Sequence, residues 1–359
     1  MKAWEKNIRT IKHPYVAGYQ PKDYSVTKLN ANENPYPPAP GVVKAMEEFE
    51  TSSLRLYPAL NADELIDEIA HFKQVKPSQV FVGVGSDDVI GMCFLTYFNS
   101  GKPILFPDIT YSFYDVWADL YRIPYECPKL DEKFHIKKED YYKDNGGIIF
   151  ANPNAPTSIA VGLDFIRDVL EHNQDVIVIV DEAYIDFGGE SAVSLLEEYD
   201  NLVVVQTFSK SRSLAGLRVG YCIASEELIQ ALNTVKFSYN SYTMNMLAIK
   251  LGAESVKDTE YFYQTIDKII ATRTWSKEQL EQLGFTCMDS STNFLFATHK
   301  SMAAKEIFEK LQERKIYVRH FDKERIDNYL RITIGTDQQM EQLVNALKEI
   351  LPDEKNING

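Results

Sequence analysis

Between two apolar runs the chain reads Thr207-Phe208-Ser209-Lys210-Ser211-Arg212-Ser213-Leu214-Ala215-Gly216-Leu217-Arg218. The preceding run, residues 202–205, predicts a buried strand, and the second run begins at Val219. A lysine at the end of a buried strand is poorly solvated, and a neutral amine there can form a Schiff base with a carbonyl. The neighbouring serines and Arg218 could bind an anion such as phosphate. A polar loop with an ordinary surface lysine accounts for these residues equally well.

A second stretch supports the chemical interpretation. Residues 175–180 form a nearly unbroken β-branched run that ends in Asp181. Such a run predicts a strand covered on both faces, as in the parallel sheet of an α/β protein. An aspartate at the carboxyl end of such a strand faces the crevice where these sheets bind ligands, and it could keep the ring of pyridoxal phosphate cationic. Asp181 could instead cap the next helix, but its combination with Lys210 favours the cofactor.

These stretches belong to a set of motifs that resembles the fold-type I pyridoxal-phosphate aminotransferases. Asp181-Glu182-Ala183-Tyr184, Thr207-Phe208-Ser209-Lys210 and Gly216-Leu217-Arg218 carry this resemblance. The segments at 29–35 and 329–335 make the chain similar to the histidinol-phosphate aminotransferases, which act in histidine biosynthesis. Each motif is weak alone, but together they follow the family's order and cover nearly the whole chain.

The resemblance implies an α/β fold of the aspartate aminotransferase type (fold type I), with an N-terminal arm at residues 1–40. A large pyridoxal-phosphate-binding domain with a mostly parallel central sheet would follow at 41–262, and a small α/β domain at 263–359. Apolar periodicity is compatible with this division. It predicts a connecting helix at 261–283 and, in the small domain, a strand at 316–319.

For the cofactor ring, the resemblance implies a catalytic lysine, Lys210, which holds pyridoxal phosphate and later moves the substrate proton. Asp181 would pair with the pyridine nitrogen and Tyr184 with the phenolic oxygen. Tyr111 would stack on the ring, although a tyrosine at this strand end could also pack in an interface. Tyr57 would reach the site of the partner subunit in a homodimer.

For the cofactor phosphate, the chain offers a glycine turn that leads into a helix. Backbone amides of Gly85, Ser86 and Asp87 at the helix N-terminus would cradle the phosphate together with Ser209 and Arg218. Glycine lets the backbone approach closely. A strand-glycine-helix turn without any ligand is common, and acidic residues also suit the first turn of a helix.

The chain departs from the family at residues 152–158. The family usually has an asparagine at the position of Ala155, which hydrogen-bonds the phenolic oxygen, and a glycine at that of Ser158. An alanine cannot donate, so either Asn154 takes this place or Tyr184 holds the oxygen alone. Because that hydrogen bond affects the acidity of the cofactor linkage, the departure affects the pH optimum more than the reaction class.

Four residues would bind the substrate according to the resemblance: Tyr15, Asn32, Arg319 and Arg331. Both arginines fall at predicted strand positions, where they could grip a carboxylate or phosphate bidentately. Each arginine alone is more often part of a surface ion pair. The asparagine could simply make a turn.

Composition limits the partners. The chain has 359 residues and a net charge of −14, which argues against nucleic acid or an anionic membrane as partner. Its four cysteines are scattered and its histidines show no metal spacing, so we expect a cytoplasmic protein with reduced thiols and no metal. The N-terminus lacks the apolar segment of a signal peptide.

The predicted reaction is amino transfer between histidinol phosphate and 2-oxoglutarate, giving imidazole-acetol phosphate and glutamate. Threonine-phosphate decarboxylase and aromatic aminotransferase are alternatives with the same fold. A non-catalytic cofactor-binding domain of a transcription regulator would need an attached basic DNA-binding segment. A protein-interaction scaffold would not need Asp181, Lys210 and Arg218 in this order.

Overall fold

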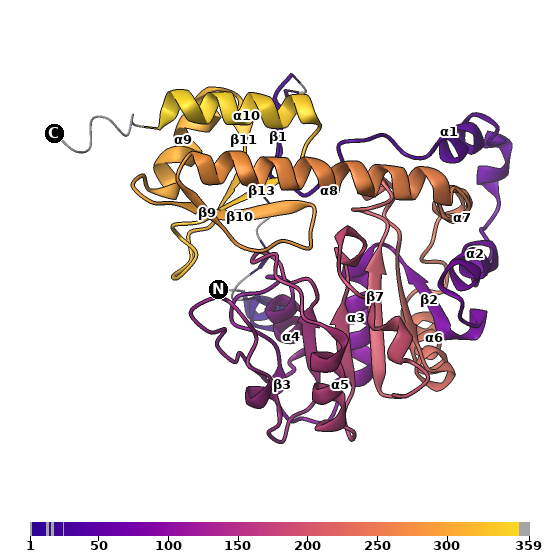
Figure 1. Cartoon of the computed structure of the whole chain (residues 1–359). Helices are drawn as coiled ribbons and strands as arrows, with labels where there is room; N and C mark the ends of the chain where they lie inside the picture. Colours follow the sequence, from indigo (N-terminus) through magenta and orange to yellow (C-terminus); the bar gives the residue numbers. More distant parts are fainter. Residues whose placement is uncertain (1, 12–13, 16–17, 24, 352–359) are drawn as a thin grey trace.

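The computed structural model describes residues 2–11, 14–15, 18–23 and 25–351. A large α/β part carries the central sheet, and a smaller α/β part lies beside it (Figure 1). The long helix α8 (Thr259–Gln282) runs along both parts. The predicted α/β fold class is confirmed, and the helix predicted at 261–283 corresponds to α8. The boundary predicted at residue 262 stays a prediction, because α8 passes it without a break.

The large part is built on a seven-stranded sheet. All its strands are parallel except β8, which runs antiparallel to both of its neighbours. In the order in which they lie side by side, the strands are β2 (Val80–Gly83), β8 (Gly220–Ala224), β7 (Leu202–Thr207), β6 (Val178–Asp181), β5 (Ile148–Ala151), β3 (Ile104–Leu105) and β4 (Tyr125–Glu126). Asp181 is therefore the last residue of β6, and Lys210 lies just after β7, the neighbouring parallel strand.

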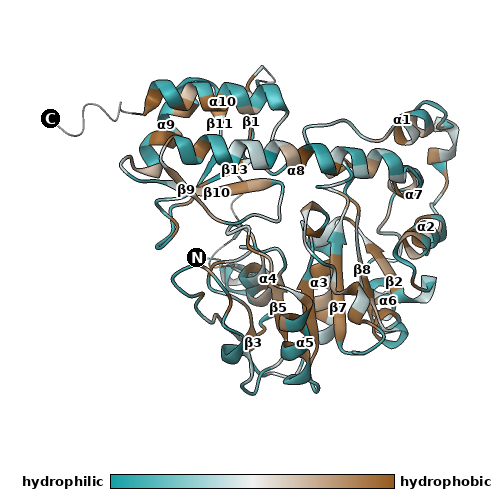
Figure 2. Ribbon diagram, in the orientation of Figure 1, coloured by the Kyte–Doolittle hydropathy of each residue, from teal (hydrophilic) through white to brown (hydrophobic). Residues whose placement is uncertain are grey.

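Both faces of this sheet are buried. Val178 and Val180 of β6 pack into one core, and Ile179 between them packs into another on the opposite face. This alternation explains why the predicted strands contain almost no polar residue. The apolar strands lie under helices whose outer sides are hydrophilic (Figure 2). The helices of this part are α1 (Pro40–Glu47), α2 (Asp63–Lys73), α3 (Ser86–Tyr97), α4 (Tyr114–Tyr121), α5 (Leu163–Glu171), α6 (Glu226–Tyr239) and α7 (Met246–Lys257).

The small part has a four-stranded antiparallel sheet covered by α8, α9 (Ala304–Glu313) and α10 (Asp337–Ile350). Its strands, in spatial order, are β12 (Arg319–His320), β13 (Leu330–Thr333), β10 (Phe294–His299) and β9 (Phe285–Cys287). The single strand expected at 316–319 is wrong. It divides into β11 (Ile316–Tyr317) and β12, which belong to different sheets, with the buried Val318 between them.

The N-terminal arm crosses from the small part to the large part. Its strand β1 (Thr27–Lys28) pairs in parallel with β11, and the following loop runs to α1. Residues 1, 12–13, 16–17 and 24 of the predicted arm lie outside the described residues. The remaining short 3-10 helices are η1 (Ala3–Asn7), η2 (Thr51–Arg55), η3 (Pro77–Gln79), η4 (Lys138–Tyr141), η5 (Ile185–Phe187), η6 (Ala192–Leu195) and η7 (Ala215–Leu217).

Polar side chains join the two parts. Arg325 pairs with the Asp108 carboxylate at 3.1 Å and donates to the carbonyl oxygens of Leu130 and Asp131. Lys323 donates to the Asp108 carbonyl oxygen at 2.6 Å. These contacts hold the loop after β12 against the large part, so the small part forms one wall of the cavity described below.

Over the described stretches, no helix has both the length and the apolar character needed to span a bilayer. The same stretches contain no group of three or more His, Cys, Asp or Glu side chains arranged to hold a metal ion.

Candidate active site

A cavity of about 790 Å³ lies between the large part, the small part and the arm. It opens at the carboxyl ends of β6 and β7, the place expected for a ligand in an open α/β sheet. Most of the predicted site residues line it: Tyr15, Asn32, Ser86, Asp87, Tyr111, Asp181, Tyr184, Ser209, Lys210, Arg218, Arg319 and Arg331. Gly85, Asn154 and Tyr57 are not among the lining residues.

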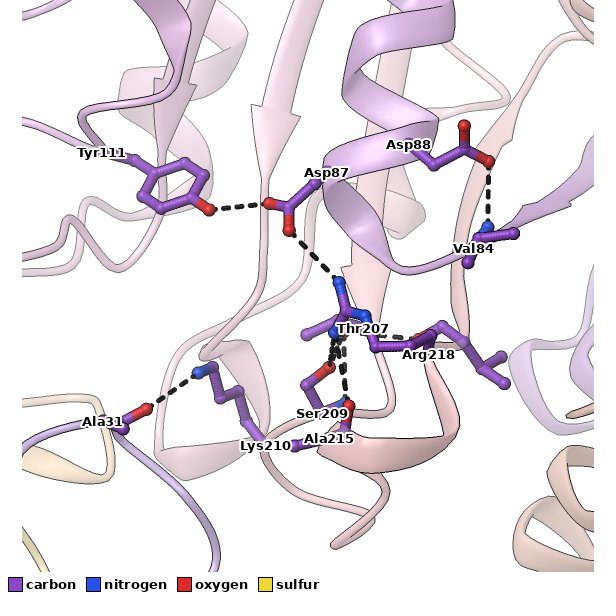
Figure 3. Close-up of polar contacts among 11 residues, drawn as sticks. Ala31, Val84, Asp87, Asp88, Tyr111, Thr207, Ser209, Lys210, Ala215 and Arg218 are labelled. Atoms are coloured by element: carbon purple, nitrogen blue, oxygen red, sulfur yellow. Dashed lines mark hydrogen bonds and ion pairs between the residues drawn. The ribbon is translucent and has the colours of Figure 1, made fainter. Parts of the chain in front are cut away.

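Lys210 extends into this cavity from the loop after β7 (Figure 3). Its Nζ donates to the Ala31 carbonyl oxygen at 3.4 Å and lies 5.5 Å from the centroid of the Tyr184 ring. The Asn34 amide donates to the carbonyl oxygens of Lys210 and Ser211, which fixes the backbone of the loop. Lys210 is thus a half-buried residue in the cavity wall and not an ordinary surface lysine.

Asp181 ends β6 and is only 4% exposed. Its carboxylate accepts hydrogen bonds from the Tyr114 hydroxyl at 2.7 Å and the Ala183 amide at 3.2 Å. The next helical turn, η5, has Tyr184 as its N-cap, so Asp181 does not cap it. Burial raises the pKa of Asp181 to about 6, although both hydrogen bonds oppose this shift. A cationic partner in the cavity would stabilise this carboxylate, which makes no ion pair within the described residues.

The turn before α3 has the close backbone approach expected of a phosphate cradle. Gly85 has φ +84°, and a Cβ there would lie 2.4 Å from an Arg218 nitrogen. A Cβ on Gly220 would lie 2.2 Å from the Ser86 nitrogen. No side chain caps the first turn of α3, so the Ser86 and Asp87 amides remain available as donors. The Gly85 N–H, which was also predicted to bind the phosphate, instead donates to the Gly83 carbonyl oxygen at 2.9 Å.

Arg218 and Ser209 lie beside that turn (Figure 3). The guanidinium donates to the Ser209 hydroxyl at 3.4 Å and pairs with the Asp87 carboxylate at 3.2 Å. The other Asp87 oxygen accepts from the Tyr111 hydroxyl at 2.6 Å. The Asp87 side chain therefore orients both Arg218 and Tyr111, a role beyond the backbone contact predicted for it.

In the segment that departs from the family pattern, the Asn154 side chain has no N–H group left to donate to a ligand. Its amide nitrogen donates to the Ile109 carbonyl oxygen and the Thr157 hydroxyl, and its oxygen accepts from Thr110. Asn154 is 3% exposed, so the predicted contact of its side chain with the cofactor is not supported by this geometry. The alanine methyl of Ala155 lines the cavity instead.

Arg319 and Arg331 are direct cross-strand partners on β12 and β13. Arg331 donates to the Asn30 carbonyl oxygen at 3.1 Å, while its Nε is buried without a partner. Burial lowers the pKa of Arg331. Neither arginine forms an ion pair with a carboxylate in the described part of the chain. Like charges placed opposite each other repel, so an anion between them would be stabilising.

The two remaining predicted tyrosines lie in different places. Tyr15 stacks on Phe113 with a centroid distance of 4.4 Å and lines the cavity. Tyr57 is 80% exposed and contacts Tyr242 on another face of the molecule. Its predicted reach into a partner's site stays a prediction.

Comparisons with known proteins agree with this geometry. The profile of the aminotransferase class I and II family matches residues 24–347. The chain is 49% identical over 353 residues to the histidinol-phosphate aminotransferase of Lactococcus lactis subsp. cremoris strain MG1363, covering 98% of this chain and 99% of that protein. The chain belongs to the histidinol-phosphate aminotransferase family.

Two further relatives extend the comparison. The histidinol-phosphate aminotransferase of Clostridium botulinum strain Hall is 47% identical over 351 residues, with 98% of this chain and 99% of that protein covered. The crystal structure of histidinol-phosphate aminotransferase from Sinorhizobium meliloti, in complex with pyridoxal-5'-phosphate, has a TM-score of 0.83. At 20% identity over 91% of this chain and 90% of that one, it confirms the fold-type I architecture of the family.

Sequence reasoning missed three side chains in this family site. Tyr114 holds Asp181, Asn34 holds the lysine loop, and the Asp87 carboxylate holds Arg218. Asn34 belongs to the segment that carried the resemblance, which was the available signal. Nothing in a single sequence distinguishes Tyr114 from the other tyrosines.

Proposed function

We propose that this aminotransferase moves an amino group between histidinol phosphate and 2-oxoglutarate in histidine biosynthesis, with pyridoxal phosphate held at Lys210. The products would be imidazole-acetol phosphate and glutamate. The observation that carries the choice of a phosphorylated substrate is the arginine pair, Arg319 opposite Arg331, in the same cavity as Lys210. A phosphorylated amine fits these two cations and the lysine at once.

The chemistry of the cavity fits pyridoxal phosphate at three points. Asp181 is a buried carboxylate without a cationic partner in the described residues, which suits a protonated pyridine nitrogen. The free amides of α3, with Ser209 and Arg218, suit a phosphate. The amine of Lys210 can react with the aldehyde of the cofactor. When bound, the cofactor supplies a ring that withdraws electrons from the carbon bearing the amino group.

The protein's own residues would divide the remaining work. Lys210 would carry the proton to and from that carbon through its Nζ, as a general base and acid. Asp181 would keep the ring nitrogen protonated, and Tyr184 would donate a hydrogen bond to the phenolic oxygen. Arg331 would bind the α-carboxylate of glutamate, and both arginines would bind the substrate phosphate.

The alternative functions differ in the substrate group that Arg319 and Arg331 would have to bind. A threonine-phosphate decarboxylase also needs a phosphate site, so the arginine pair alone does not separate it from the aminotransferase. An aromatic aminotransferase would not need two arginines for its amino-acid side chain. The close relatives reported above are all named histidinol-phosphate aminotransferases, which favours the first function.

Steady-state kinetics of arginine variants tests the substrate proposal. A charge-assisted hydrogen bond contributes about 1.5–3 kcal/mol, so losing one arginine should cost roughly tenfold to a hundredfold in kcat/KM. Arg319→Ala should impair histidinol phosphate and largely spare glutamate, whereas Arg331→Ala should impair both. Arg314→Ala, which removes an exposed arginine at the C-terminal end of α9, is the matched control and should change the kinetics with neither substrate. Equal effects of Arg319→Ala on both substrates would contradict the proposal.

The proposed function also includes a homodimer with shared sites and a cytoplasmic location. Tyr57 supports the first part, because a tyrosine 80% exposed beside the exposed Tyr242 is well placed for a contact with a second copy. Apolar side chains in the preceding part of the sequence are exposed as well: Val43, Met46, Leu54 and Leu56. The location remains a prediction from the sequence.

A further inference from the structure

Asn32 in the N-terminal arm has its side-chain amide fixed in one orientation. The residue is 1% exposed and has φ +56°, in the left-handed region that asparagine tolerates. The Thr333 hydroxyl accepts from the Asn32 backbone N–H at 2.9 Å and donates to Asn32 Oδ1 at 3.1 Å. Because the oxygen of the amide faces Thr333, its nitrogen must face the other way. Asn32 Nδ2 donates to the Tyr184 hydroxyl at 2.8 Å.

This contact determines where the Tyr184 proton points. An amide nitrogen can only donate, so the Tyr184 oxygen accepts from Asn32 and its own proton must face another group. Tyr184 lines the cavity beside Lys210, and its hydroxyl makes no other hydrogen bond in the described residues. The proton is therefore available to a ligand in the cavity. Accepting one hydrogen bond also strengthens a hydroxyl as the donor of the next.

The hydrogen bond from Asn32 to Tyr184 matters more because residue 155 is an alanine. At this position the family usually supplies a second donor, an asparagine, to the phenolic oxygen of the cofactor. Here a methyl group takes its place, and Asn154 already uses both of its N–H groups within the protein. Tyr184 is then the donor on which the phenolic oxygen depends.

We propose that Asn32 is a positioning residue that orients and polarises Tyr184 toward the phenolic oxygen of the cofactor, compensating for the alanine at 155. The inference rests on the proposed function, since it requires pyridoxal phosphate at Lys210. It assigns Asn32 a role toward Tyr184 in place of the direct substrate contact expected from the resemblance.

The pH titration of the bound cofactor's visible absorbance tests this role without relying on turnover. When the linkage between cofactor and lysine loses its proton, the phenolic oxygen carries a negative charge with no neighbouring cation, so it depends most on the Tyr184 proton. Loss of this donation should therefore raise the pH midpoint. We expect Asn32→Ala to raise it by about 0.5–1 pH unit, the equivalent of one ordinary hydrogen bond.

Further variants keep the test decisive. Asn32→Ala should cause no additional shift in a Tyr184→Phe background, because the hydroxyl through which Asn32 acts is absent. Thr333→Val, which frees the Asn32 amide to rotate, should raise the midpoint by a smaller amount and provides the test if Asn32→Ala fails to fold. Thr265→Val makes the same chemical change at a buried site in α8 and should leave the midpoint unchanged.

Different results of this titration would overturn the role of Asn32 alone or the proposed function as well. An unchanged midpoint in Asn32→Ala, or in Thr333→Val where the first variant does not fold, would overturn the role of Asn32. So would an equal shift with and without the Tyr184 hydroxyl. A wild-type protein that binds no pyridoxal phosphate would instead overturn the proposed function together with the inference.

Discussion

Replacing Lys210 by alanine is expected to reduce turnover of histidinol phosphate by about 10⁴-fold or more. Proton transfer by a positioned side chain contributes up to roughly 10⁴-fold, and loss of the covalent linkage adds to this. The lysine is half-buried in the cavity wall, and among the described residues its Nζ makes one hydrogen bond, a weak one of 3.4 Å to the Ala31 carbonyl oxygen, besides lying 5.5 Å from the centroid of the Tyr184 ring. Because these contacts are weak, the fold should tolerate the change. Turnover and thermal unfolding of the same preparation measure both effects.

Lys250→Ala provides the control for Lys210→Ala. Lys250 is a lysine on α7 whose side chain is 44% exposed and pairs with Glu64 at 3.1 Å, and such solvent-facing pairs contribute little to stability. We expect wild-type turnover from it. Wild-type turnover from Lys210→Ala as well would remove the lysine from the mechanism.

Asp181→Asn should reduce turnover by about 10²–10³-fold, the range observed when one preorganised electrostatic contact is lost. The asparagine has the same shape but no charge, so it cannot keep the ring nitrogen of the cofactor protonated, and the ring then withdraws electrons poorly. Burial raises the pKa of Asp181 to about 6 in the absence of a cationic partner. A protonated ring nitrogen against it would oppose this shift, so cofactor binding and ionisation of Asp181 favour each other.

Tyr114→Phe distinguishes the charge of Asp181 from its orientation. This variant removes the hydroxyl that donates to Asp181 at 2.7 Å but leaves the carboxylate in place. We expect a loss smaller than that of Asp181→Asn, measured as kcat with saturating histidinol phosphate. A cofactor-bound crystal structure with Asp181 distant from the ring nitrogen would refute the role assigned to this carboxylate.

The sequence was sufficient for the elements that surround the site. The runs at 175–180 and 202–205 were recognisable as buried strands because strands covered on both faces must be apolar throughout, although β6 begins only at Val178. The helix at 261–283 was recognisable because an apolar stripe repeats at helical spacing. Helix α7 was not predicted, although the charged residues Lys250, Glu254 and Lys257 recur along it at helical spacing.

The contacts within the site required the structure. Both arginines could be assigned to strands, but their direct opposition depends on the register of β12 with β13. The hydrogen bond from Asn32 to Tyr184 joins residues separated by 152 positions, and no local pattern encodes it. Motif order gave the residues that line the cavity, whereas Tyr114, Asn34 and the Asp87 carboxylate act through partners far away in the sequence.

The central claim is that this site transfers the amino group of histidinol phosphate. The most direct measurement mixes the protein loaded with pyridoxal phosphate with histidinol phosphate alone and follows the cofactor spectrum. We expect conversion of the cofactor from its aldehyde form to its amine form, reversal by 2-oxoglutarate, and no conversion by threonine phosphate. An unchanged spectrum with histidinol phosphate, or release of carbon dioxide from threonine phosphate, would contradict the account.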